Sequence, residues 1–133
     1  MQIEVVFPGN KKVDARIREF TVKTDQPVQS GGDNTAPSPY DLFLASIGTC
    51  AGIFVKGFCL QRNISTDGIR LIEEVIPGQE HGTLSKVRID VQVPPDFPEK
   101  YKEALIATVN LCSVKKTMQK PPQFETVVTV KET

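Results

Sequence analysis

The apolar residues of the chain are concentrated in one long stretch, residues 38–59, which carries little charge. Ser38 is a favourable N-cap, Pro39 suits the first helical position, and Asp41 completes an S-x-x-D capping box. No charged residue follows until Lys56, and a helix that is apolar on all sides is typically buried. Glycines interrupt the stretch and no other segment resembles a membrane span, so we expect the central core helix of a soluble protein.

The segments on either side of this helix alternate between apolar and polar residues or carry short apolar runs, as strands do. The predicted strands are residues 2–7, 13–22, 69–76, 83–93 and 124–130. We expect the first two to form an N-terminal hairpin, with a change of register near Glu19, and the third and fourth a second hairpin. Asp96 should then cap a helix that ends near Asn110, and a short helix follows over residues 112–118. The order β-β-α-β-β-α-α-β predicts a single α+β domain over residues 1–133, with a long buried central helix.

The loop over residues 25–37 is long for a compact domain and rich in residues that form turns. Loops of this length without secondary structure are often functional. The pair Gly31 and Gly32 could present main-chain amides to a ligand or a partner. The loop could equally be an ordinary connection to the N-cap of the central helix, and the sequence leaves both interpretations open.

Composition and charge argue against several classes of function. The sixteen basic and sixteen acidic residues cancel, so no overall charge attracts nucleic acid or an anionic membrane. Three cysteines without a C-x-x-C pair, together with a single histidine, argue against a disulfide framework and a zinc site, and we expect no metal or cofactor. The chain shows no apolar N-terminal segment with a cleavage site, so we predict a reducing, cytoplasmic location.

The three cysteines differ in their predicted settings. Cys50 lies among small residues in the middle of the central helix, too far from the helix end for the dipole to lower its pKa much. Cys59 points to the opposite side of the same helix, and we expect it to be buried and inert. Cys112 opens a helix and is followed by Lys115 and Lys116, a setting that favours thiolate at least as strongly as that of Cys50. Cys50 is therefore either a packing residue or one half of a reactive pair with Cys112.

Two segments of the chain resemble a known family. Residues 35–50, TAPSPYDLFLASIGTC, resemble the opening of the central helix in the OsmC/Ohr superfamily, as does the preceding DQPVQSGGD of residues 25–33. The segment NLCSV at residues 110–114 resembles the second cysteine of that family, at the start of a short helix. The order of predicted elements is similar across nearly the whole chain.

The resemblance implies an OsmC-like fold and an intertwined homodimer, with two central helices inside and two active sites at the subunit interface. It also implies that Cys50 is the thiolate that attacks a small organic hydroperoxide and becomes a sulfenic acid. Cys112 would then form a disulfide with Cys50, and an external dithiol reductant would restore both thiols. These steps agree with the general oxidation chemistry of cysteine.

The chain departs from the peroxidases of this family at two charged positions. They carry a glutamate ten residues before the first cysteine, where this chain has Tyr40 followed by Asp41. They also carry an arginine near the N-terminal hairpin, for which no residue here aligns clearly. We name Tyr40 and Asp41 as candidate residues lining the site. The predicted function is a thiol-dependent peroxidase, and the alternative is a non-peroxidase member that binds a small apolar ligand at the dimer interface.

Overall fold

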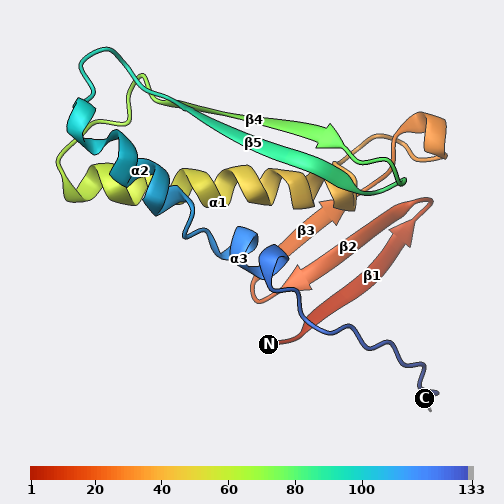
Figure 1. Ribbon diagram of the computed structural model, residues 1–133. Helices are drawn as coiled ribbons and strands as arrows, with labels where there is room; N and C mark the ends of the chain where they lie inside the picture. The colour runs from red at the N-terminus through yellow and green to blue at the C-terminus, as the bar shows by residue number, and fades with distance from the viewer. Residues whose placement is uncertain (132–133) are drawn as a thin grey trace. The chain divides into compact units, whose positions relative to one another are not determined.

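The computed structural model describes residues 1–131, which form two compact units (Figure 1). The first unit is Met1–Ile47 and the second begins at Gly48. Helix α1, Pro39–Gln61, begins in the first unit and continues into the second. Its 23 residues confirm the predicted central helix.

The N-terminal unit contains a three-stranded antiparallel sheet of order β1-β2-β3 (Figure 1). The strands are β1 (Ile3–Gly9), β2 (Lys12–Ile17) and β3 (Phe20–Thr24). The single strand predicted over residues 13–22 is therefore wrong, because a two-residue turn divides it. Arg18 takes a positive φ of 51° in this turn and Ile17 pairs directly with Phe20. Arg-Glu lacks the Gly, Asn or Asp that usually indicates such a turn.

The long loop that precedes α1 is held by one buried carboxylate. Asp25 is fully buried and accepts hydrogen bonds from the main-chain N–H of Gln26 at 2.8 Å and of Thr35 at 3.0 Å. The Thr35 hydroxyl donates a further bond to it at 2.6 Å. These bonds hold the pKa of Asp25 well below its usual range, first through the Thr35 hydroxyl and then through the Thr35 amide. The loop is therefore ordered from within by an ionised side chain.

The two glycines of this loop stabilise the conformation of the loop. The N–H of Gly31 donates to the Val28 carbonyl at 3.0 Å, and that of Gly32 to the Pro27 carbonyl at 3.1 Å. A Cβ at position 32 would lie 2.0 Å from the Gln26 carbonyl oxygen, so only glycine fits there. The hypothesis that these amides face a ligand is wrong, because both are already bonded around the short 3-10 helix η1, Val28–Ser30.

The predicted capping box opens α1. The Asp41 N–H donates to the Ser38 hydroxyl oxygen at 3.2 Å, and the Ser38 N–H donates to the Asp41 carboxylate at 3.3 Å. Two of the amides that a helix start leaves unpaired are thus satisfied reciprocally. The boundary between loop and helix is fixed at the residue that the sequence indicates.

The C-terminal unit packs a hairpin and short helices against the rest of α1. Strands β4 (Arg70–Pro77) and β5 (Leu84–Gln92) are antiparallel, with Leu71 opposite Val91, and confirm the second predicted hairpin. Helices α2 (Lys102–Val109) and α3 (Ser113–Gln119) follow. The apolar core of this unit comprises Ala51, Val55, Phe58, Cys59, Phe97, Leu105 and Val109, from α1, α2 and the segment between β5 and α2.

The start of the α2 region differs from the expectation that Asp96 caps a helix. The first helical turn is the 3-10 helix η2, Glu99–Tyr101, and the residue before it is Pro98. A residue that precedes proline is driven out of the helical region, so Phe97 cannot continue a helix begun at Asp96. Phe97 is instead buried, and its N–H donates to the Pro94 carbonyl at 3.0 Å.

The strand predicted over residues 124–130 is not formed in the described chain. Residues 121–131 run without assigned secondary structure, and Phe124, Val128 and Val130 are 89%, 94% and 94% exposed. An alternating segment becomes a strand only where another strand supplies hydrogen bonds and an apolar surface. No such strand lies beside this segment in the described residues, so the segment joins no sheet.

Helix α1 is covered on one side only. Val55 and Cys59 are 2% and 0% exposed, whereas Ile53 and Leu60 are 63% and 64% exposed. The expectation of a helix buried on all sides is therefore wrong for the single chain. By length and hydropathy α1 could also cross a membrane, but core helices of globular proteins pass the same test.

Replacement of Asp25 by asparagine should lower the melting temperature by at least about 5 °C at pH 7, because an amide NH₂ would face N–H and O–H donors. Since folding lowers the pKa of Asp25, its stabilising effect is present above the unfolded pKa and is lost as the pH falls through the folded value. Thermal melts from pH 3 to 8 should therefore show the difference shrinking in acid. Asp67→Asn, at an exposed position in the loop before β4, is the matched control. An unchanged melting temperature in Asp25→Asn would contradict the role of this carboxylate.

Candidate active site

The C-terminal unit brings Cys50 and Cys112 together. Cys50 lies in the middle of α1 and is partly exposed, whereas Cys112 is the N-cap of α3 and only 3% exposed. The Cys112 N–H donates to the Val109 carbonyl at 3.2 Å, which fixes the turn between α2 and α3. The thiol of Cys112 donates a hydrogen bond to the sulfur of Cys50. Two residues far apart in the sequence thus form one contact between free thiols.

Hydrogen-bond donors stabilise the thiolate of Cys50. The largest influence is the Cys112 thiol, followed by the main-chain N–H of Val114, and the N–H of Ser113 adds a smaller one. Together these donors outweigh the effect of burial and lower the pKa of Cys50 below that of an ordinary thiol. A charge-assisted bond to a thiolate is stronger than one to a neutral thiol. The site therefore favours Cys50 as the ionised partner.

The pKa of Cys112 is shifted in the opposite direction to that of Cys50. Burial raises the pKa of Cys112, and its hydrogen bond to Cys50 raises it further, because a donated proton is hard to remove. The expectation that Cys112 is at least as activated as Cys50 is thus wrong. The sequence places Cys112 correctly at a helix start, but burial and the contact with Cys50 outweigh the Lys115 and Val114 amides, which lower the pKa of Cys112.

Cys59 lies apart from this pair, in the apolar core. It is 0% exposed and packs with Val55 and Phe58 among the core residues. Burial raises the pKa of Cys59, so its thiol stays neutral and poorly nucleophilic. The prediction of a buried cysteine is confirmed.

Tyr40 and Asp41 have local structural roles in the first turn of α1. Asp41 forms the capping box with Ser38, and the Tyr40 ring packs edge-on against Phe43 with centroids 5.8 Å apart. These contacts account for both side chains within the N-terminal unit. Their assignment as residues lining the thiol site stays a prediction.

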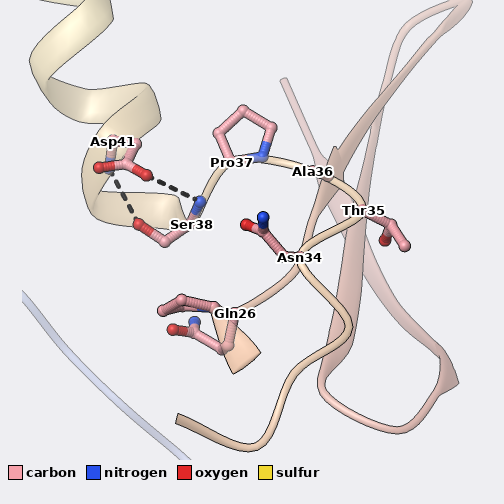
Figure 2. A pocket seen from close by; sticks show the side chains of 8 residues that line it. Gln26, Asn34, Thr35, Ala36, Pro37, Ser38 and Asp41 are labelled. Carbon is pink, nitrogen blue, oxygen red and sulfur yellow. Dashed lines mark hydrogen bonds between the residues drawn. The ribbon is translucent and has the colours of Figure 1, made fainter. Parts of the chain in front are cut away.

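A polar hollow of about 490 Å³ lies at the start of α1 in the N-terminal unit (Figure 2). Its lining residues are Gln26, Pro27, Asn34, Thr35, Ala36, Pro37, Ser38 and Asp41. Sequence reasoning missed it, although the run of turn-forming residues was a signal. The capping box on its wall already uses the first polar groups of the helix. Among residues 1–131, no three His, Cys, Asp or Glu side chains converge as metal ligands would.

The model of the OsmC-like protein family matches residues 31–127, which include both Cys50 and Cys112. This chain belongs to the OsmC-like protein family. The resemblance drawn from the sequence is confirmed. No curated protein sequence matches the chain.

Solved structures of OsmC-like proteins share the fold. A protein of Psychrobacter arcticus 273-4, described as osmotic stress induced and of the detoxification response, has a TM-score of 0.73 and 21% identity, covering 88% of this chain and 87% of its own. The organic hydroperoxide resistance protein OsmC of Legionella pneumophila has a TM-score of 0.56 and 17% identity, with coverages of 89% and 88%. An organic hydroperoxide resistance protein of Vibrio cholerae O1, with captopril in one of its active sites, has a TM-score of 0.60 and 13% identity, with coverages of 91% and 86%. At these identities the likeness establishes the OsmC-like α+β fold.

Replacement of Ser113 by proline should raise the pKa of Cys50, because it removes one main-chain N–H that bonds the thiolate. Proline fits the first position of α3, and Cys112 before it already has ψ of 127°, which proline prefers in its predecessor. The pH dependence of Cys50 alkylation measures the effect, and the rate at neutral pH should fall several-fold. Ser113→Ala keeps the N–H and should react like the parent. Equal rates in both variants would contradict amide stabilisation of Cys50.

Proposed function

We propose that this OsmC-like protein is a thiol-dependent peroxidase that reduces small organic hydroperoxides. The observation that carries the proposal is the hydrogen bond between Cys50 and Cys112, with the pKa of Cys50 lowered and that of Cys112 raised. A nucleophile must be ionised and reachable, and Cys50 meets both conditions better than the buried Cys112. The two cysteines therefore divide the roles that the family resemblance implies.

In the first step, the thiolate of Cys50 attacks the terminal oxygen of the hydroperoxide. A sulfur–oxygen bond forms, the oxygen–oxygen bond breaks, and the alkoxide leaves and takes a proton to become an alcohol. Cys50 is oxidised to a sulfenic acid by two electrons. Cys50 is itself partly exposed in the middle of α1, which supports access of a substrate to its sulfur.

In the second step, the sulfur of Cys112 attacks the sulfenic sulfur of Cys50. The disulfide forms, and the hydroxyl group leaves with the thiol proton of Cys112 as water. The contact between the two side chains supports this step, because no large movement is needed to bring the sulfur atoms together. An external dithiol then reduces the disulfide by thiol–disulfide exchange and is itself oxidised to a disulfide.

Hydrogen-bond donors take over part of the electrostatic work that charged residues do in peroxidases of the family. A thiol and two main-chain amides supply partial positive charge at the sulfur of Cys50. Such donors lower the thiolate free energy without the desolvation cost of burying a guanidinium. The lack of a clearly aligned arginine therefore does not by itself prevent ionisation of Cys50.

A non-peroxidase role is the second candidate. The Vibrio cholerae protein of the same fold holds captopril, a small molecule, in one of its active sites. A ligand-binding OsmC-like protein would bind a small molecule at its active site without turning over a peroxide. In that case an organic hydroperoxide would leave the thiols of this chain unchanged, which separates the two candidates.

We also infer that the chain acts as an intertwined homodimer in which residues 1–133 form one domain, in a reducing compartment such as the cytoplasm. The open side of α1, with Ile53 and Leu60 exposed, matches a second copy of the same helix. The alternating segment 124–130 has no neighbouring strand among residues 1–131, and a second copy could supply one. The free thiols at all three cysteines agree with reducing conditions.

One equivalent of cumene hydroperoxide should remove two thiols from the reduced protein and lower its mass by about two hydrogens. Intact-mass spectrometry and thiol titration measure both changes. Cys50→Ser should not react within minutes, and Cys112→Ser should stop at a sulfenic or more oxidised form of Cys50. Cys59→Ala keeps the reactive pair and should behave like the parent. Persistence of all thiols in the parent would favour the ligand-binding role instead.

Replacement of Ile53 by aspartate should convert the dimer into monomers or unfold it, because the exposed side of α1 would carry a charge into the interface. Light scattering after size-exclusion chromatography gives the molar mass of each form. Gln79→Asp adds the same charge in the exposed turn after β4 and should leave the dimer intact. A monomeric parent at micromolar concentration would contradict the proposed assembly.

A further inference from the structure

The C-terminal unit contains a half-buried acidic residue that the proposed reaction does not use. Glu73 lies in β4 on the same face of the strand as Leu71 and Val75, and it pairs with Ile89 of β5. Leu71 and Ile89 pack against the α1 core, so the side of the hairpin that carries Glu73 faces the helix. The next residue, Glu74, is exposed and pairs with Arg88 at 2.9 Å. Two adjacent glutamates thus lie on opposite faces of one strand.

The carboxyl group of Glu73 occupies the space that a side chain at position 48 would fill. A Cβ built on Gly48 would lie 2.6 Å from Oε1 of Glu73. The Gly48 N–H donates a hydrogen bond to this carboxyl. Its other oxygen, Oε2, is buried, and residues 1–131 offer it no hydrogen-bond partner. A glycine in α1 and a glutamate in β4 therefore fit one another, but the fit leaves one acidic oxygen unsatisfied.

An ionised carboxylate in this place is costly. A buried acceptor without a partner loses its hydration, and the loss is greater for a charged group than for a neutral one. Burial accordingly raises the pKa of Glu73, and the Gly48 N–H offsets only part of that effect. On α1 the charged residue that follows Gly48 is Lys56, two turns on, which donates to the Thr66 hydroxyl at 3.2 Å. On β5, Arg88 and Asp90 alternate with Ile89 and therefore face away from the helix.

We propose that Glu73 is a proton-binding lock between β4 and the turn of α1 that runs from Gly48 to Cys50. With a proton bound, the neutral carboxyl docks against Gly48 and holds the hairpin to the helix. When the proton leaves, the buried charge weakens that contact and loosens the helical turn that carries Cys50. The lock makes the packing of this segment depend on pH whichever substrate Cys50 meets.

The direction of the pH dependence follows from the raised pKa. The folded chain binds the proton of Glu73 more tightly than the unfolded chain, whose pKa is near 4.5. The contribution of Glu73 to stability is therefore fully present below that value and is lost as the pH rises through the folded pKa. Glutamine at this position stays neutral at every pH, and its variant should lack this loss.

The test compares the melting temperatures of the full-length parent, Glu73→Gln and Glu74→Gln between pH 4 and pH 9. Glu73→Gln should melt about 3 to 6 °C higher than the parent at pH 8 and within about 1 °C of it at pH 4. Glu74→Gln removes an exposed charge and should show no such pH-dependent gain. A Glu73→Gln variant that is less stable than the parent at pH 8, or a difference that does not vary with pH, would overturn the lock.

Two further measurements test the lock in ways that do not depend on how well a glutamine side chain packs at position 73. Gly48→Ala must displace the carboxyl from its place, so its stability relative to Glu73→Gln should not vary with pH. Hydrogen exchange of the amides of residues 48–52, corrected for intrinsic rates, should speed up between pH 6 and pH 8 in the parent but not in Glu73→Gln. Equal exchange in both proteins would show that Glu73 does not act on the turn carrying Cys50. Neither readout uses a peroxide, so failure here leaves the proposed peroxidase activity untouched.

Discussion

The packing of one helix face against a hairpin and two short helices is the interaction on which this structure depends. Helix α1 is too apolar to be stable when it is fully exposed to water. Burial of a side chain such as Val55 or Phe58 contributes about 1.5–3 kcal/mol to the stability of the folded chain. The same packing brings Cys112 to Cys50, because Cys112 comes soon after α2, and α2 supplies Leu105 and Val109 to the shared core. The chemistry of the thiol pair thus rests on ordinary apolar contacts one turn away.

The thiol site uses dipoles where a charged partner would be expected. Main-chain N–H groups are lost only on substitution by proline, and their direction is fixed by the helix that carries them. Donors held in this way need no reorganisation when a negative charge appears on sulfur, which is the general advantage of a preorganised site. A chain without the charged residues of its relatives can therefore still favour a thiolate.

Much of the fold could be predicted because short stretches of sequence determine it. The capping box of Ser38 and Asp41, the alternation along β5 and the helix start at Cys112 are each encoded within a few residues. The errors arose where the deciding contact is distant or the local signal is unusual. The turn at Arg18 lacks glycine or asparagine, and Pro98 delays a helix that Asp96 would otherwise cap. The burial of Glu73 depends on Gly48, which no periodicity connects to it. The activated thiol was misjudged for the same reason, since amides beside Cys112 bond the sulfur of Cys50.

The place of Cys112 between α2 and α3 has a thermodynamic consequence for the oxidised protein. A bond between its sulfur and that of Cys50 would close a loop of about 60 residues, which by the chain-entropy model destabilises the unfolded state by about 4 kcal/mol. In the proposed cycle, the disulfide intermediate would then have a larger free energy of unfolding than the reduced protein. If the chain is the peroxidase proposed above, its oxidised form would resist heat and proteases better than its reduced form, so the proposed turnover would protect the chain during exposure to peroxide.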